Sequence, residues 1–292
     1  MFEIKKILNI DYILGLKLEY DIISEYNYKI TDKNNNEVID YKNKIEQQIN
    51  LGYLKENFYG KEIEVNLEAV GIESNFELPT DKYLKELSTI NNKIEILIGK
   101  TGEIIKILNF DELRREWESK KIELRNKYFK DDTMLSLIEL TDLGYNNDVV
   151  FKVNFFNNLV YKLLFFDGYN KVYVTNQIKK GKFEIRNYIK DISLPMANEI
   201  YMKEYDLSKN MLKIVMEGKL RERLFDNNKF TERFGFDEKQ KLKSKLEIIY
   251  HFEITTGYIL KCECKLISES QNYFQENKIN IIGKGKKDYE WI

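Results

Sequence analysis

The chain has 292 residues, 43% hydrophobic and 33% charged, so it can bury a large core and is too apolar to be disordered. Its 47 lysines and arginines nearly balance 48 aspartates and glutamates. This balance argues against the basic surface that nucleic-acid binding requires, so no nucleic-acid partner is expected. The one small basic cluster, GKGKK at 283–287, is interpreted as a solvated loop.

No segment reaches the roughly 18 apolar residues that a membrane-spanning helix needs. The first residues, MFEIKKILNI, contain no apolar run of signal-peptide length before Asp11. We therefore expect no membrane span and a cytoplasmic location.

Alternating apolar and polar residues predict strands in the first third of the chain. In 18–30 the even positions are mostly apolar and the odd positions mostly charged or polar. A return strand is expected at 39–51 and another at 62–70. The stretch 94–108 predicts two strands joined by a tight hairpin, in which Gly102 supplies a positive φ.

Two helices are expected next. The first, at 109–128, has Asn109 and Glu112 at capping-box spacing and an apolar stripe among charged residues. A second, shorter helix is expected from residue 131 up to Gly144.

Short stretches rich in β-branched and aromatic residues indicate that strands resume after residue 145. They are VVFKVNFF (149–156), LVYKLLFF (159–166), KVYVTNQI (171–178) and KFEIRNYIKDI (182–192), then 212–225 and 229–236 on either side of a turn. A strand is also expected at 242–254, where a helix over 237–249 is the competing interpretation. The strand is favoured because the alternation continues unbroken into HFEI.

Both cysteines lie in the stretch HFEITTGYILKCECKL at 251–266. If its second half is a strand, Leu260, Cys262, Cys264 and Leu266 share the face that points to the core. Burial among uncharged groups raises the pKa of a thiol and leaves it inert.

The only histidine, His251, belongs to the polar face of the preceding strand. A Cys-x-Cys pair without further cysteine or histidine ligands falls short of the four ligands of a structural zinc site. The stretch is therefore interpreted as scaffold, and no metal or cofactor is expected.

Apolar residues on both faces of the stretch 151–174 mark a candidate binding surface. A sheet that is apolar on both faces must be covered on both. One interpretation is that an internal helix fills a curved sheet, and the other is a hydrophobic ligand cavity or a protein-docking face. The candidate ligand- or partner-binding residues are Phe155, Phe156, Tyr161, Phe165, Phe166 and Tyr173.

Two strand–Thr-Gly–strand hairpins, at 94–108 and 251–266, suggest two similar β-rich halves. Residues 1–145 would end in the helices and 146–292 would form the second half. The two halves could equally form one continuous domain.

The pattern NNKIEILIGKTGEIIKILNFDELRREWESKKIEL, with the later hairpin YHFEITTGYILKCECKLIS, resembles a broad set of bacterial β-rich proteins. In that set a strand–Thr-Gly–strand hairpin leads into a charged helix, and a second hairpin closes the domain. More distantly the chain is similar to LolA-like carriers, in which a strongly curved antiparallel sheet wraps around helices and holds acyl chains. The resemblance covers about two-thirds of the chain and brings no catalytic motif.

The expected fold class is α+β. It is mainly an antiparallel meander, forming a curved sheet or open barrel with helices packed on its concave side. The expected function is non-enzymatic binding of a protein partner or an apolar ligand. An accessory, immunity or chaperone-type protein of a bacterial secretion or injection system belongs to this class.

The alternative is a carboxylate-dependent hydrolase or transferase with its site in the sheet cavity, since the chain has 48 acidic residues. An apolar pocket on the concave face favours binding. Two or more convergent acids with raised pKa values favour the enzyme.

Overall fold

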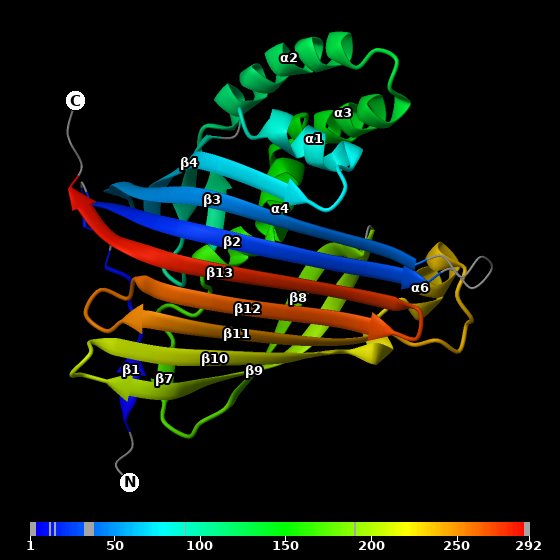
Figure 1. The fold of residues 1–292 in the computed structure, drawn as a ribbon. Coiled ribbons are helices and arrows are strands. Elements are labelled where there is room, and N and C mark those ends of the chain that lie inside the picture. Colours follow the sequence, from blue (N-terminus) through cyan, green and yellow to red (C-terminus); the bar gives the residue numbers. More distant parts are fainter. Residues whose placement is uncertain are drawn as a thin grey trace.

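The computed structural model describes residues 4–11, 13–14, 16–31, 38–90, 92–189 and 191–288. Within them, one antiparallel sheet dominates (Figure 1). In the order in which they lie side by side, its strands are β6 (Ile104–Ile107), β5 (Lys93–Ile98), β4 (Lys61–Ser74), β3 (Val38–Glu56), β2 (Leu16–Thr31), β13 (Tyr273–Asp288), β12 (Ile259–Ser270), β11 (Lys243–Glu253), β10 (Met211–Leu220), β9 (Ile192–Asp206) and β8 (Lys179–Ile189). The sheet is not closed, because β6 and β8 remain its two edges.

Helices cover the concave side of this sheet. The helical elements are α1 (Pro79–Leu87), α2 (Phe110–Lys127), α3 (Asp132–Tyr145), α4 (Asp148–Asn157), α5 (Leu159–Leu164), the 3₁₀ helix η1 (Glu222–Leu224) and α6 (Asn227–Phe234). Figure 1 shows the convex face in front, with α4 behind the sheet and with α1, α2 and α3 above β4 in this view. A separate small sheet pairs β1 (Lys5–Ile7) with β7 (Val172–Val174). The expected fold class, mainly antiparallel strands with a modest share of helices, is confirmed in this broad form.

The alternation found in the sequence explains how the sheet buries one face. Tyr20 and Ile22 of β2 point to the concave side and are almost fully buried. In β11, every second residue from Ser244 to Phe252 is buried, so this segment is a strand, as predicted. These residues join the apolar faces of the helices in one hydrophobic core.

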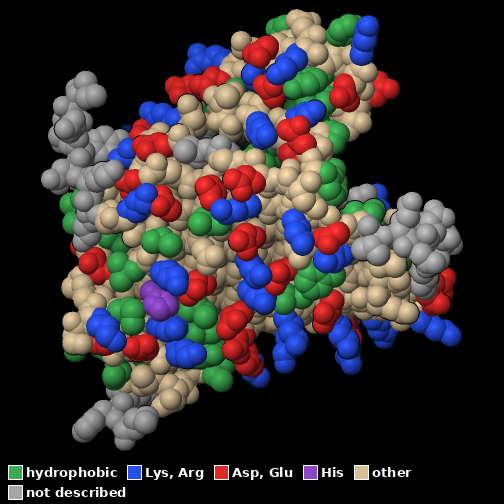
Figure 2. Space-filling model, viewed as in Figure 1, with side chains coloured by type: hydrophobic (Ala, Val, Ile, Leu, Met, Phe, Trp, Pro, Cys, Tyr) green, Lys and Arg blue, Asp and Glu red, His purple; other side chains and the backbone are tan. Residues whose placement is uncertain are grey.

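Figure 2 shows that the opposite, convex face carries acidic and basic side chains interspersed over the strands. This agrees with the nearly balanced charge of the chain. Among the described helices, none combines the length and apolar character needed to cross a membrane.

The predicted strand that carries both cysteines is confirmed as β12, with one correction. Cys262 and Cys264 are free and buried, and burial raises the pKa of the Cys264 thiol to about 12. Leu260, however, is 40% exposed, whereas Ile259 is buried. The register between β11 and β12 shifts next to His251, and this irregularity turns Leu260 away from the core.

His251 lies on the convex face, opposite the cysteines, as predicted. It is half-buried and pairs in register with Lys213 and Lys261. Partial burial, followed by the charge of Lys213, lowers the pKa of its imidazole.

Residues 149–156 and 159–164 are helical and Phe165 and Phe166 lie in no strand, so the strands predicted at 149–156 and 159–166 are wrong. Asn147 caps α4, because its side chain accepts hydrogen bonds from the amides of Val149 and Val150. Asn158 caps α5 by accepting from the amide of Val160. These segments are apolar on several sides because they are core helices, and short apolar runs do not separate buried helices from strands.

Three smaller predictions also need correction. Asn109 is the N-cap residue of α2, as predicted, but its side chain makes no capping hydrogen bond and instead accepts from the backbone amide of Glu95 and donates to the carbonyl of Lys93. Most of 229–236 belongs to α6. The basic cluster 283–287 is not a loop, because β13 continues to Asp288, with a register shift between Gly283 and Gly285.

The two sequence halves meet along the pair β2–β13. These strands are matched from Leu16 with Asp288 to Ile30 with Tyr273. The boundary at residue 145 and the suggested duplication stay predictions.

Candidate functional site

The aromatic residues selected from the sequence separate into three places. Phe155 of α4 is buried, and its ring stacks on that of Tyr161 of α5, with centroids 3.9 Å apart. Burial raises the pKa of Tyr161 to about 12, so its hydroxyl stays neutral. Phe156 also lies in α4, but its side chain is outside the described part of the structure.

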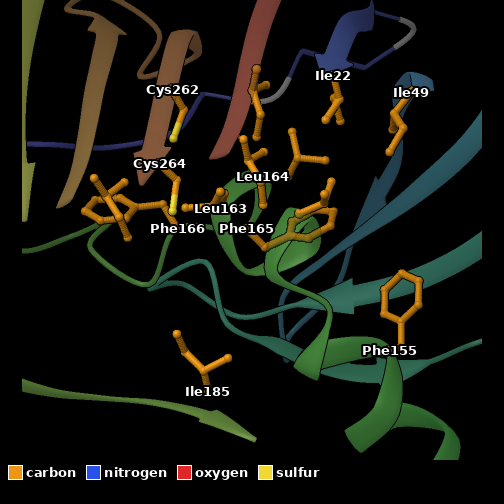
Figure 3. Close-up of a cluster of buried hydrophobic side chains, with 14 of the residues drawn as sticks. Ile22, Ile49, Phe155, Leu163, Leu164, Phe165, Phe166, Ile185, Cys262 and Cys264 are labelled. Carbon is orange, nitrogen blue, oxygen red and sulfur yellow. The ribbon is translucent and has the colours of Figure 1, made fainter. Parts of the chain in front are cut away.

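Phe165 and Phe166 follow α5 and belong to the core. The ring centroids of Phe166 and Tyr250 lie 4.7 Å apart. Figure 3 shows Phe166 close to Cys264, with Phe155 much farther away. Both phenylalanines, together with Tyr161, line a hollow of about 330 Å³. Tyr173 of β7 is buried elsewhere in the core, where its hydroxyl donates to the carbonyl of Gly168.

A cavity of about 660 Å³ lies on the concave side, and Phe155 and Tyr161 form part of its wall. Its other walls come from α1, the end of β8 and the segment that joins α4 to α5. The apolar lining residues are Ile45, Leu67, Ile72, Leu84, Leu87, Ile94, Phe155, Leu159, Val160, Ile185 and Ile279. Together with four tyrosines they make up about half of the lining residues, so the cavity can accept an apolar body beside polar groups.

The cavity has a polar floor, defined here as Ser24, Tyr26, Asn43, Gln275 and Asn277 on three adjacent strands. Tyr26 of β2 pairs in register with Asn43 of β3 on one side and with Asn277 of β13 on the other. Adjacent strands lie about 4.8 Å apart, so these side chains form one short row across the sheet.

Asp81 of α1 fixes one side of this floor. It is 2% exposed and accepts hydrogen bonds from the Tyr41 hydroxyl (2.6 Å), the Asn43 amide nitrogen (3.0 Å) and the Leu78 backbone amide (2.9 Å). Burial, and next the hydrogen bond to Asp81, raise the pKa of Tyr41, which therefore remains a neutral donor. The carboxylate thus holds α1 against β3 and orients Asn43.

Three buried oxygen atoms of the floor have no hydrogen-bond partner among the described residues. They are Ser24 Oγ, Asn43 Oδ1 and Asn277 Oδ1. Buried polar groups are nearly always hydrogen-bonded in folded proteins, so a cluster of exceptions at one place calls for an explanation.

The residues that line the cavity do not favour carboxylate-dependent catalysis. The acidic residues among its described members are Glu25 and Asp81, and Asp81 is engaged as stated above. In the described part of the chain, the carboxyl groups with a shifted pKa all have it lowered. The described residues also contain no group of three or more His, Cys, Asp or Glu side chains that could hold a metal ion.

No family model matches the sequence, and no curated protein sequence matches it. Among solved structures, the chain is similar to lipovitellin, as seen in a structure that concerns "lipid-protein interactions in lipovitellin". The TM-score is 0.54 at 10% sequence identity, over 97% of this chain and 26% of lipovitellin. The chain thus spans about a quarter of that protein. At this identity the likeness shows the fold alone, a large curved antiparallel sheet.

Sequence reasoning missed the polar floor and α1. One signal was present, because Ser24 interrupts the apolar series on the inward face of β2. For α1, Pro79 at the first helical position and Asp81 in the first turn are ordinary helix-start residues.

Proposed function

We propose that this protein is a non-enzymatic binding protein that holds a small molecule with an apolar body in the concave cavity. The observation that carries the proposal is the 660 Å³ cavity, whose lining includes apolar side chains from each of α1, α4, α5 and β8. Small-molecule sites typically measure about 300–1,000 Å³ and combine apolar walls with a few placed polar groups. The likeness in fold to lipovitellin, whose structure concerns lipid-protein interactions, is compatible with this proposal.

The proposal refines the expectation drawn from the sequence and from the LolA-like resemblance. Of the two occupants considered, an apolar ligand is preferred to a protein partner because the site is concave and lies beneath helices. An accessory, immunity or chaperone-type role and a cytoplasmic location remain predictions.

Filling the cavity tests this proposal. Ser24→Phe adds a ring on the concave face of β2, whereas Ile23→Phe changes the neighbouring residue on the opposite face. We expect Ser24→Phe to weaken binding of the neutral apolar dye Nile red at least tenfold, or about 1.4 kcal/mol. Ile23→Phe should bind as the wild type does.

The measurements are dye fluorescence titration and thermal unfolding of each variant, together with native mass spectrometry of the freshly purified protein. A wild type that binds no dye and carries no small molecule would contradict the proposal. So would equal binding by both folded variants.

A further inference from the structure

The unpartnered oxygens of the polar floor bear on the chemistry of the ligand. Asn43 is 8% exposed, and its amide nitrogen donates to Asp81. A carboxylate only accepts hydrogen bonds, so the nitrogen must face Asp81 and Oδ1 must face away from it. The atom left without a partner is therefore an acceptor.

Ser24 and Asn277 extend this site along the same face. Ser24 is two residues from Tyr26 on β2, and Asn277 is paired in register with Tyr26. A ligand group that donates hydrogen bonds to this row would satisfy Asn43 Oδ1 and Asn277 Oδ1, and a hydroxyl can donate to or accept from Ser24 Oγ.

The charges of the lining restrict that donor to an uncharged group. Among the described residues that line the cavity, the one lysine or arginine is Arg186, whose side chain is 51% exposed and whose Nε lies 3.1 Å from a carboxylate oxygen of Glu184. A carboxylate or phosphate would bring further acceptors to a row of acceptors, and the described lining offers no buried cation to neutralise it. A buried ammonium would find no buried counter-ion among the described lining residues, because Asp81 is already engaged and Glu25 is exposed, at a position of β2 that alternates with the inward-facing Ser24 and Tyr26.

An apolar groove adjoins the cavity. A second hollow, of about 310 Å³, lies between α3 and α4 and is lined by Leu137, Leu140, Tyr145 and Phe151 among others. It shares Leu87, Asn154 and Phe155 with the cavity, so the two hollows are neighbours. Leu140 is 65% exposed, which leaves this groove with an apolar mouth.

We infer that the ligand is a single-chain amphiphile with an uncharged hydroxylated head, such as a monoacylglycerol. The head would bind the polar floor, and the acyl chain would run past Phe155 toward the groove between α3 and α4. This inference rests on the proposed binding function and adds the ligand class and its orientation.

The test compares ligands that share a twelve-carbon chain and differ only in the head. Below their aggregation thresholds, monolauroylglycerol, lauric acid and dodecylamine are titrated into the wild type by Nile red displacement. We expect monolauroylglycerol to bind at least tenfold more tightly than either charged ligand.

One pair of variants locates the head, and a single variant tested with two chain lengths locates the chain. Asn277→Leu should reduce the preference for the glycerol head at least fivefold, whereas Asn280→Leu, on the opposite face of β13, should leave it unchanged. Leu140→Gln should weaken binding of monopalmitoylglycerol at least threefold while leaving the eight-carbon homologue unaffected.

The outcomes distinguish a failure of this inference about the ligand class from a failure of the proposed binding function. Equal or tighter binding of lauric acid or dodecylamine by the wild type would overturn the inference but not the proposed function. Retention of the full preference in folded Asn277→Leu would also overturn it, as would an unchanged affinity of Leu140→Gln for the longer chain. If neither Nile red nor any amphiphile binds, the proposed function itself fails.

Discussion

At the scale of single residues, the glycine of the β11–β12 turn is required by two independent constraints. Gly257 has φ +72°, which is strained for residues with a side chain. A Cβ atom there would also lie 1.9 Å from the carbonyl oxygen of Asn9. The N-terminal segment is therefore packed directly against this turn.

Gly235 provides a matched comparison for this position. It has a similar φ of +64° at the end of α6, but nothing lies within 4 Å of the site of a Cβ. We expect Gly235→Ala to lower the free energy of unfolding by about 1–2 kcal/mol, the cost of the backbone conformation alone. Gly257→Ala should cost roughly 4 kcal/mol, because backbone strain and the steric clash combine. Urea denaturation measures both, and equal losses would contradict the close packing of Asn9.

At the scale of elements, the α4–α5 segment shows where sequence reasoning reaches its limit. Strands such as β2 and β11 were predictable because one face is exposed to solvent and the other is buried, which gives the sequence an alternation with a period of two. The segments 149–156 and 159–166 lack that contrast, and their β-branched and aromatic residues favour strands by local propensity. The helical state of 149–156 and 159–164 depends on packing inside the sheet, which no local pattern contains, and on the N-caps Asn147 and Asn158, a local signal that the strand interpretation did not use.

The N-cap of α4 is open to a direct test. Asn147→Ala removes the side-chain acceptor for the amides of Val149 and Val150. It should lower the free energy of unfolding by about 1 kcal/mol, whereas Asn147→Asp retains a capping oxygen and should cost much less. Urea denaturation followed by circular dichroism gives both values. A loss of the same size in the two variants would mean that capping is not the cause.

The candidate site was predictable only in part, because its residues come from strands and helices that are far apart in the sequence. Phe155 and Tyr161 were selected from their aromatic character, and they do line the cavity. Asn43 and Asn277 are 234 residues apart and become neighbours of Tyr26 only through the pairing of β2 with both β3 and β13. Register between distant strands is set by the whole sheet, so single-strand patterns could not bring these residues together.

At the scale of the whole molecule, the seam between β2 and β13 joins the beginning of the chain to its end. Residues from both sequence halves contribute to one hydrophobic core. We therefore expect a single cooperative unfolding transition in urea, with coincident midpoints by far-UV circular dichroism and by intrinsic fluorescence. Two separated transitions would instead support independent domains at 1–145 and 146–292.

The edges of the sheet have a consequence for solubility. Unpaired edge strands can recruit other chains and start aggregation. Here β6 offers only four residues, and β8 begins with Lys179, Lys180, Gly181 and Lys182, of which the last three are exposed. A second copy that approached β8 would bring like charges together, and the glycine would weaken any added strand. The curved sheet can thus keep two open edges without growing into fibrils.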